Sequence, residues 1–173
     1  AAEGARLVTL SSTGHKISGI RWDDIHFNDS EYEKWAAYGQ SKTAASLLAV
    51  EVDKRMKDSG VRAFGVHPGG IMTPLQRHLE QEEMVALGWM DKDGQPTERV
   101  AKMFKSATQG ASTTLWAATS PQLDGIGGVY CENCEVAAPT DDGENARFIG
   151  VNDWAVDSDE ASRLWDETEH MLS

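Results

Sequence analysis

Two residues with acid–base potential, Tyr38 and Lys42, lie four positions apart in the sequence. In a helix this spacing places both side chains on one face, about one turn apart. A free tyrosine has a pKa of about 10. An ammonium group roughly 5 Å away, at an effective dielectric constant of ~20, contributes about 3 kcal/mol and lowers that pKa by about two units. The phenol could then exchange a proton near neutral pH. The alternative is a solvated tyrosine beside a surface lysine, which is what an isolated Y-x-x-x-K most often is.

The helix that would hold this pair is predicted over residues 35–57. Apolar residues recur there at helical spacing, at Ala44, Leu47, Leu48, Val52 and Met56. Charged residues fall mostly off that stripe, at Glu51, Asp53, Lys54 and Arg55. Ser59 and Gly60 are expected to end the helix.

Short runs of strand-forming residues flank this helix, at 6–10 and 61–66. A helix between two strands predicts a right-handed βαβ unit with parallel strands. The fold class is therefore α/β, as part of a doubly wound parallel sheet. A third strand is expected at 127–131. Further helices are expected at 73–88, at 97–119 with an interruption near Gly110, and at 159–172, whose inner face would be Ala161, Leu164, Trp165, Thr168 and Met171.

Polar and glycine-rich residues follow both strands of this unit. Ser12 comes after the first strand, and Pro68, Gly69 and Gly70 come after the second. The carboxyl ends of parallel strands meet at one edge of a sheet, where open α/β sheets place their ligands. We therefore expect these segments to converge with Tyr38 on one crevice.

Three motifs together resemble the short-chain dehydrogenase/reductase family, in that family's order and spacing. They are L-S-S at 10–12, Y-G-Q-S-K at 38–42 and H-P-G-G-I-M-T at 67–73. The runs S-S-T-G-H at 11–15 and S-K-T-A-A-S-L-L-A-V-E at 41–51 look most like the retinol dehydrogenase and WW-domain oxidoreductase branch. The resemblance covers residues 6–131, and the C-terminal helix fits that branch too.

The resemblance implies a catalytic role for three side chains. Tyr38 would donate or accept the proton, Lys42 would lower the pKa of Tyr38 and bind the nicotinamide ribose, and Ser12 would orient the substrate oxygen. Ser11 is the other candidate for that last role. The implied reaction is reversible NAD(P)-dependent hydride transfer between an alcohol and a carbonyl on a small to medium apolar substrate.

The resemblance also implies a cofactor-binding segment. Pro68, Gly69 and Gly70 would pass beneath the nicotinamide, with the Ile71 backbone and the Thr73 hydroxyl facing its carboxamide. NADP is slightly favoured over NAD, and no metal is implied.

The family's first half has no counterpart in this chain. Its glycine-rich turn, the residue that selects NAD or NADP, its Asn-Ala-Gly motif and its catalytic asparagine are all missing. The run D-G-I-G-G-V-Y at 124–130 does not fit G-x-G-x-x-G. We therefore expect residues 1–173 to form a partial Rossmann-like domain, the catalytic and substrate half. The N-terminal half would be its partner, and without that half the first strand would leave an apolar, unpaired edge. The alternative function is an interaction half without turnover.

Other reactive residues have structural alternatives. Cys131 and Cys134 form C-x-x-C without a second such pair, and structural cysteines are favoured over a redox pair or a metal site. His15 and His67 flank the expected crevice. A histidine held by backbone hydrogen bonds is favoured there over a substrate contact.

Residues 75–90 occupy the place of the family's substrate lid and are rich in apolar side chains. These are Leu75, Leu79, Met84, Val85, Leu87, Trp89 and Met90. An apolar lid suits an apolar substrate, and ordinary helix packing with a charged outer face is the alternative.

Composition bounds the remaining function classes. The formal charge is −12, from 16 basic and 28 acidic residues, and 40% of the 173 residues are hydrophobic. Such a surface repels nucleic acid and anionic lipid unless it carries a basic patch, and no basic run occurs. No stretch approaches the ~20 apolar residues that span a bilayer. We expect a soluble, cytoplasmic protein that acts on a small-molecule alcohol or carbonyl. The sequence does not decide between a monomer and a homodimer.

Overall fold

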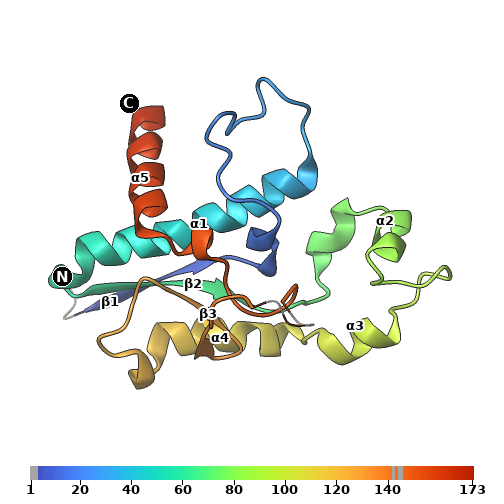
Figure 1. Cartoon of the computed structure of the whole chain (residues 1–173). Helices are drawn as coiled ribbons and strands as arrows, with labels where there is room; N and C mark the ends of the chain where they lie inside the picture. Colours follow the sequence, from blue (N-terminus) through green and yellow to red (C-terminus); the bar gives the residue numbers. More distant parts are fainter. Residues whose placement is uncertain (1–3, 142, 144–145) are drawn as a thin grey trace.

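The computed structural model describes residues 4–141, 143 and 146–173 of the chain. Four strands form one sheet in the order β1 (Ala5–Leu10), β2 (Val61–His67), β3 (Val129–Glu132) and β4 (Glu135–Val136). The first three strands run parallel, in the register Leu10↔Val66 and His67↔Glu132, and β4 is antiparallel to β3. The helix α1 (Lys34–Met56) covers one face of the sheet and α4 (Ala107–Thr119) covers the other (Figure 1). The predicted α/β fold with a parallel sheet is confirmed.

The βαβ unit is formed as the sequence predicts. At the start of α1 the Glu33 carboxylate accepts hydrogen bonds from the backbone N–H groups of Trp35 and Ala36, which caps the helix. A short 3-10 turn (Lys57–Ser59) and Gly60, at a φ of +79°, then turn the chain into β2.

The buried face of α1 differs from the predicted stripe. Glu51 and Asp53 are buried, whereas Leu48 and Met56 are 41% and 40% exposed. The two carboxylates can be buried because each is paired: Glu51 accepts from Arg55 Nε at 2.6 Å, and Asp53 forms a bidentate pair with Arg62 at 2.8 and 2.9 Å. Apolar periodicity could not reveal these partners.

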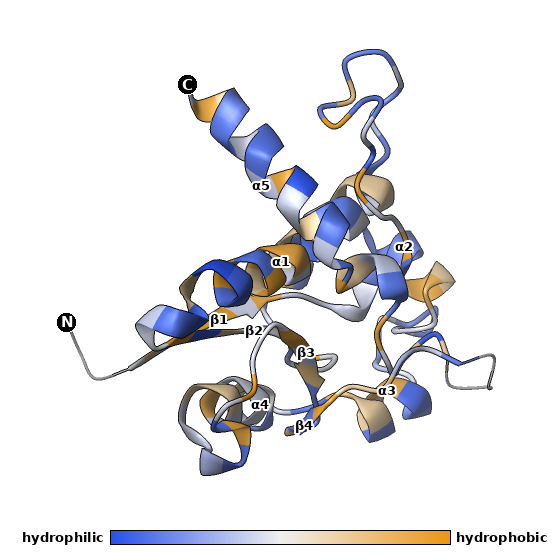
Figure 2. Ribbon diagram, turned by 60° about the vertical axis from the view of Figure 1, so that its left-hand side comes forward, coloured by the Kyte–Doolittle hydropathy of each residue, from blue (hydrophilic) through white to orange (hydrophobic). Residues whose placement is uncertain are grey.

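The core lies on both faces of the sheet. Between the sheet and α4 it consists of Phe64, Val66, Ala117, Leu123 and Cys131. On the opposite face, Leu47 and Val50 of α1 pack against Ala161 of α5 (Ser158–Leu172). The C-terminal end of α5 projects beyond the rest of the molecule (Figure 2). Thr168 and Met171 are therefore exposed, and the prediction that they face inward is wrong.

The connection from β2 to α4 contains three short helices. They are a 3-10 helix (Pro74–His78), α2 (Gln81–Ala86) and α3 (Glu98–Met103). The sequence predicted one long helix at 73–88 and the first part of another at 97–119. The chain becomes extended at Phe104, and the Lys105 N–H donates to the Gly70 carbonyl at 2.8 Å, which pulls this point back to the end of β2. Residues 71–104 are therefore an excursion with neighbouring ends, called the lid segment below.

The helix predicted at 97–119 is interrupted, but at residues 104–106, a few residues before Gly110, which itself lies inside α4. A Cβ atom there would come 2.0 Å from Ile71 Cδ1, so the glycine gives the Ile71 side chain its room. The helix instead begins at a capping box formed by Ser106 and Gln109.

The third strand ends in a hairpin that the sequence did not predict. Asn133 and Cys134 have φ values of +51° and +59° and form the turn between β3 and β4. A loop then leads to a 3-10 turn (Asp153–Ala155) and to α5; part of the loop predicted at 139–145 lies outside the described residues. Among the described helices, none is long and apolar enough to cross a membrane.

Candidate active site

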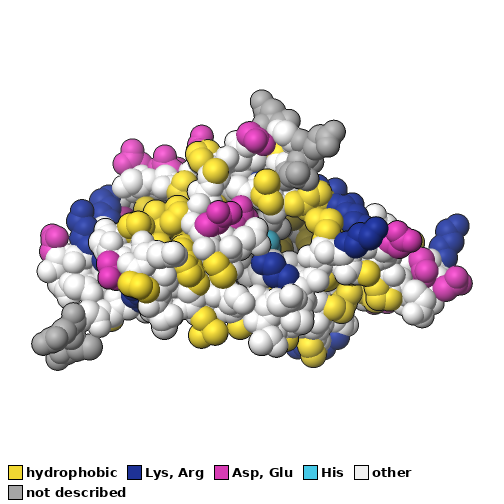
Figure 3. Space-filling model, turned by 90° about the horizontal axis from the view of Figure 1, so that it is seen from below, with side chains coloured by type: hydrophobic (Ala, Val, Ile, Leu, Met, Phe, Trp, Pro, Cys, Tyr) yellow, Lys and Arg dark blue, Asp and Glu magenta, His cyan; other side chains and the backbone are white. Residues whose placement is uncertain are grey.

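Three segments named by the sequence meet at the carboxyl ends of the strands. Ser11 and Ser12 follow β1. His67 ends β2, and Pro68, Gly69 and Gly70 come after it. Helix α1 passes the same edge with Tyr38 and Lys42. The face seen from below has a central hollow that holds a histidine side chain and is bordered by hydrophobic and basic side chains (Figure 3).

Tyr38 and Lys42 are neighbours, as their spacing predicts. The Lys42 ammonium lies 5.4 Å from the centroid of the Tyr38 ring. Lys42 Nζ donates to the Leu10 carbonyl at 3.2 Å, which ties the cation to the end of β1. Partial burial lowers the pKa of Lys42. The cation is therefore fixed beside the phenol by a backbone contact.

The two adjacent serines differ in their hydrogen bonds. The Ser11 hydroxyl is buried and donates to the Lys42 carbonyl at 2.7 Å, so its proton is already used. Ser12 Oγ is half-buried and accepts from the Gly14 N–H at 3.1 Å. Among the described residues no acceptor takes the Ser12 proton, so Ser12 is the better placed of the two to donate to a ligand oxygen.

Gly14 brings Ser12 and Tyr38 together, a role that the sequence analysis missed. A Cβ atom on Gly14 would lie 2.4 Å from Tyr38 Cε1 and 3.5 Å from Ser12 Oγ. The Tyr38 ring thus rests on the Gly14 backbone. Gly39 is equally close to this turn, because its Cβ would come 3.0 Å from the Gly14 carbonyl oxygen. Because Gly14 and Gly39 have no side chains, helix α1 can pack closely against the turn that follows β1.

His15 is held by backbone hydrogen bonds, the alternative that the sequence favours over a substrate contact. Its Nε2 accepts from the Asn152 N–H at 3.1 Å, so Nδ1 carries the proton and donates to the Ser12 carbonyl at 2.7 Å. Burial lowers the pKa of His15 to about 4. The neutral imidazole fixes the loop that carries Ser12.

His67 is different, because its buried Nδ1 has no hydrogen-bond partner among the described residues. Burial, followed by the nearby positive charge of Lys105, lowers the pKa of His67 to about 4. The side chain is therefore neutral near pH 7.

The glycines after β2 make room for the end of the lid segment. Gly69 has a φ of +95°, and its Cβ would come 2.8 Å from Lys105 Cδ. A Cβ on Gly70 would come 2.9 Å from the Phe104 ring. The sequence analysis ascribed these glycines to close approach of a cofactor, and the structure shows that they also fit against the chain itself.

The backbone groups of Ile71 and Thr73 form hydrogen bonds with the side-chain carboxamide of Gln76. Gln76 Nε2 donates to the Ile71 carbonyl at 3.0 Å, and the Thr73 N–H donates to Gln76 Oε1 at 2.7 Å. The sequence analysis missed Gln76, although T-x-x-Q is a recognisable capping box. A ligand that used these backbone groups would have to displace Gln76.

The two cysteines lie in different environments. Cys131 is buried in the core, and burial raises its pKa to about 12. Cys134 is exposed in the hairpin turn, where its N–H donates to Thr113 Oγ1 at 3.2 Å. Both thiols are free.

Among known proteins, the chain is similar to dehydrogenases and other oxidoreductases. No family model matches it. It is 37% identical to a short-chain dehydrogenase/reductase of Penicillium roqueforti over 98% of this chain and 47% of that protein. It is 38% identical to a probable oxidoreductase of Streptomyces lividans (99% and 57%) and 31% identical to mouse retinol dehydrogenase 12 (97% and 46%). The chain thus spans about half the length of these relatives.

A solved structure shares the fold. An uncharacterised protein of Mycobacterium paratuberculosis superposes with a TM-score of 0.61 and 24% identity, over 96% of this chain and 50% of that one. The chain is homologous, over nearly its whole length, to the C-terminal half of short-chain dehydrogenase/reductases.

Proposed function

We propose that this chain carries the catalytic half of an NAD(P)-dependent oxidoreductase that interconverts an alcohol and a carbonyl. One observation carries the proposal: the Lys42 ammonium lies 5.4 Å from the centre of the Tyr38 ring, at the sheet edge where Ser12 follows β1. The pair places a side chain that can exchange a proton beside a fixed positive charge. The names of the relatives, which include oxidoreductases and a retinol dehydrogenase, support the same reaction class.

In this proposal each side chain has one task. Tyr38 Oη gives a proton to the carbonyl oxygen during reduction and removes it from the alcohol during oxidation. The Ser12 hydroxyl donates a hydrogen bond to the same oxygen. Lys42 stabilises the negative charge on Tyr38 once its proton has been transferred. A bound nicotinamide would supply or accept the hydride.

The residues present fit a nicotinamide group. Lys42 makes one hydrogen bond, to Leu10, among the described residues, so ammonium protons stay available for ribose hydroxyls. The backbone of Ile71 and Thr73 offers a carbonyl acceptor and an N–H donor, and the structure shows that this pair binds a primary carboxamide, because Gln76 occupies it. Pro68, Gly69 and Gly70 would form the floor of that site. NADP is slightly favoured over NAD by family resemblance alone.

The proposed substrate is small to medium in size and apolar. Large hydrophobic side chains of the lid segment are exposed, with Met72 at 39%, Leu75 at 63% and Met103 at 47%. An apolar substrate would cover part of this surface.

The proposed partner is the N-terminal half of such a protein. In the described sheet β1 pairs only with β2, and Leu10 on β1 is 53% exposed. A further strand beside β1 would satisfy its free backbone edge and cover this side chain. Because the relatives are about twice as long as this chain, they have the length to supply such a strand.

The test is the intact mass of the purified protein, followed by titration with NADPH and NADH and by an alcohol oxidation assay. We expect the substitution Tyr38→Phe to abolish turnover while the affinity for the nucleotide stays within about twofold, because only the transferred proton is lost. Lys42→Ala should weaken both binding and rate. Full activity of Tyr38→Phe would refute the assignment. A chain that folds and ignores both nucleotides would favour the alternative, an interaction half without turnover.

A further inference from the structure

The lid segment (residues 71–104) is tied to the sheet edge at its two ends. The backbone of Lys105 bonds to Gly70, and the Phe104 ring packs on the Gly70 backbone. Between these ends the segment extends sideways from the body, with α2 and α3 at its outer part (Figure 1). A long excursion held only at its base would be free to swing, so contacts farther along decide where it rests.

One lid side chain, Glu83 on α2, bridges this outer part to α1. Glu83 Oε2 accepts from Lys34 Nζ at 2.6 Å, and Glu83 Oε1 accepts from Trp35 Nε1 at 3.1 Å. The Glu83 side chain is 19% exposed, so the carboxylate is largely enclosed. The ammonium of Lys34, followed by the other hydrogen bonds, lowers the pKa of Glu83. Both carboxylate oxygens are therefore used, and both partners are in the first turn of α1.

The same turn of α1 leads to Tyr38. Trp35 and Tyr38 are three residues apart on one helix face, and their rings meet edge to face with centroids 6.1 Å apart. The Glu83 carboxylate binds one end of the Trp35 indole, and the indole ring contacts the phenol. The lid segment is thus connected to Tyr38 through a single tryptophan.

We propose that Glu83 is a positioning residue: by holding Lys34 and Trp35 it fixes the lid segment against the turn of α1 that presents Tyr38, and so determines how firmly substrate is held there. This role rests on the proposed function for its effect on turnover. The contact itself is a property of the chain and can be tested without turnover. Loss of the Glu83 contact leaves the base of the segment intact, because Phe104 and Lys105 remain on Gly70.

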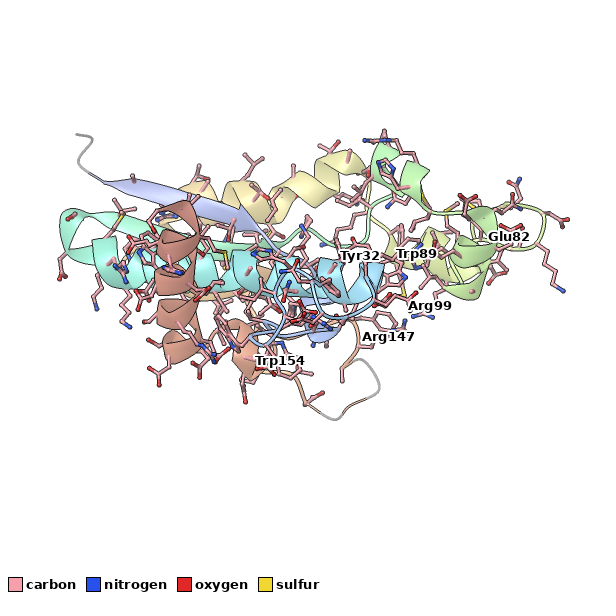
Figure 4. All side chains as sticks on the ribbon, turned by 90° about the horizontal axis from the view of Figure 1, so that it is seen from above. Tyr32, Glu82, Trp89, Arg99, Arg147 and Trp154 are labelled. Carbon is pink, nitrogen blue, oxygen red and sulfur yellow. The ribbon has the colours of Figure 1, made fainter. Side chains whose placement is uncertain are left out.

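The chain offers a matched control in the next residue, Glu82. It lies on the same helix, carries the same charge and is exposed at the outer part of the lid segment (Figure 4). Within the described residues Glu82 forms no ion pair. Glu82→Gln therefore changes the net charge and the helix as Glu83→Gln does, without touching Lys34 or Trp35.

The first measurement is limited trypsin digestion of the full chain, with cleavage at Arg77, Lys92, Arg99 and Lys102 followed by mass spectrometry. We expect Glu83→Ala to be cleaved in the lid segment roughly three to ten times faster than wild type, the change expected for one surface ion pair and one charged hydrogen bond. Glu82→Ala, which makes the same change at the neighbouring position, should match wild type. High salt should accelerate cleavage of wild type more than of Glu83→Ala, because it screens the ion pair that the variant lacks. Equal cleavage of the Glu82 and Glu83 variants would overturn the proposal.

The second measurement separates positioning from a merely structural tether. In the active enzyme Glu83→Gln and Trp35→Phe should raise KM several-fold and leave kcat within about twofold, because Tyr38, Lys42 and Ser12 stay in place. Faster cleavage with an unchanged KM would also overturn the proposal. Faster cleavage of Glu83→Ala in a protein that shows no turnover at all would instead refute the proposed function and leave the contact demonstrated.

Discussion

The ring of Tyr38 rests directly on the backbone of Gly14. A Cβ atom at position 14 would come 2.4 Å from Tyr38 Cε1 and 2.8 Å from Cδ1, distances at which one of the two must move. The proposed acid–base residue therefore has its position set by a glycine in the turn that follows β1, not only by its own helix.

Gly14→Ala tests this contact. The added methyl group would push the Tyr38 ring away from Ser12 and Lys42, so we expect kcat/KM to fall at least tenfold, with a destabilisation of about 1–3 kcal/mol for overpacking. Gly19→Ala is the matched control, since its Cβ would meet only Trp154 at an ordinary 3.7 Å. If both variants kept wild-type activity, Gly14 would have no part in placing Tyr38.

Gln76 offers a second test, at the Ile71 and Thr73 backbone groups. Because its carboxamide occupies the groups that we assign to a nicotinamide carboxamide, removing it should help the nucleotide to bind. We expect Gln76→Ala to tighten NADH binding several-fold, corresponding to about 1 kcal/mol for the hydrogen bonds that no longer have to be displaced. Nicotinamide fluorescence measures the affinity, and Arg77→Ala is the control on the same short helix. Weaker binding to Gln76→Ala than to wild type would show that the capping box supports the site instead of competing for it.

The buried imidazole of His15 predicts how stability varies with pH. Burial lowers its pKa from 6.5 to about 4, so between these values the unfolded chain binds the proton and the folded chain does not. Stability from this group is complete above pH 6.5 and is lost as the pH falls toward 4, by about 3 kcal/mol at most. Urea unfolding at pH 7 and pH 5 measures the loss. His15→Asn should reduce the slope, and an unchanged slope would assign the loss to other groups.

The exposed edge of β1 predicts self-association of the isolated chain. Leu10 is 53% exposed on a strand edge that no other described strand pairs with, so association should grow with concentration. Sedimentation velocity should show Leu10→Lys shifted toward monomer, since a charge on an edge strand opposes pairing. Leu172→Lys should behave like wild type, because Leu172 is 83% exposed at the end of α5, away from the sheet. A larger effect of Leu172→Lys would place the contact on α5.

The sequence by itself determined the βαβ unit and the pairing of Tyr38 with Lys42. Both follow from short-range rules: a helical period places residues four apart on one face, and a helix between two strands makes them parallel. The family motifs at 10–12, 38–42 and 67–73 identified the same strand edge. The sequence could not rank Ser11 and Ser12 as ligand-binding hydroxyls. Only the structure shows that the Ser11 hydroxyl already donates a hydrogen bond to the Lys42 carbonyl.

Only the tertiary structure decided the contacts between distant segments. Glu51 is buried with Arg55 of the same helix and Ser162 of α5 as its partners, and Asp53 is buried with Arg62 of β2. No periodicity within α1 contains Ser162 or Arg62. The lid segment breaks into short helices because Lys105 returns to Gly70, a constraint that acts across 35 residues of chain. Gly14 and Gly110 read as a turn residue and a helix break, yet each is required by a side chain that arrives from elsewhere, Tyr38 and Ile71. Local propensity acts along the chain, whereas these requirements arise from packing in three dimensions.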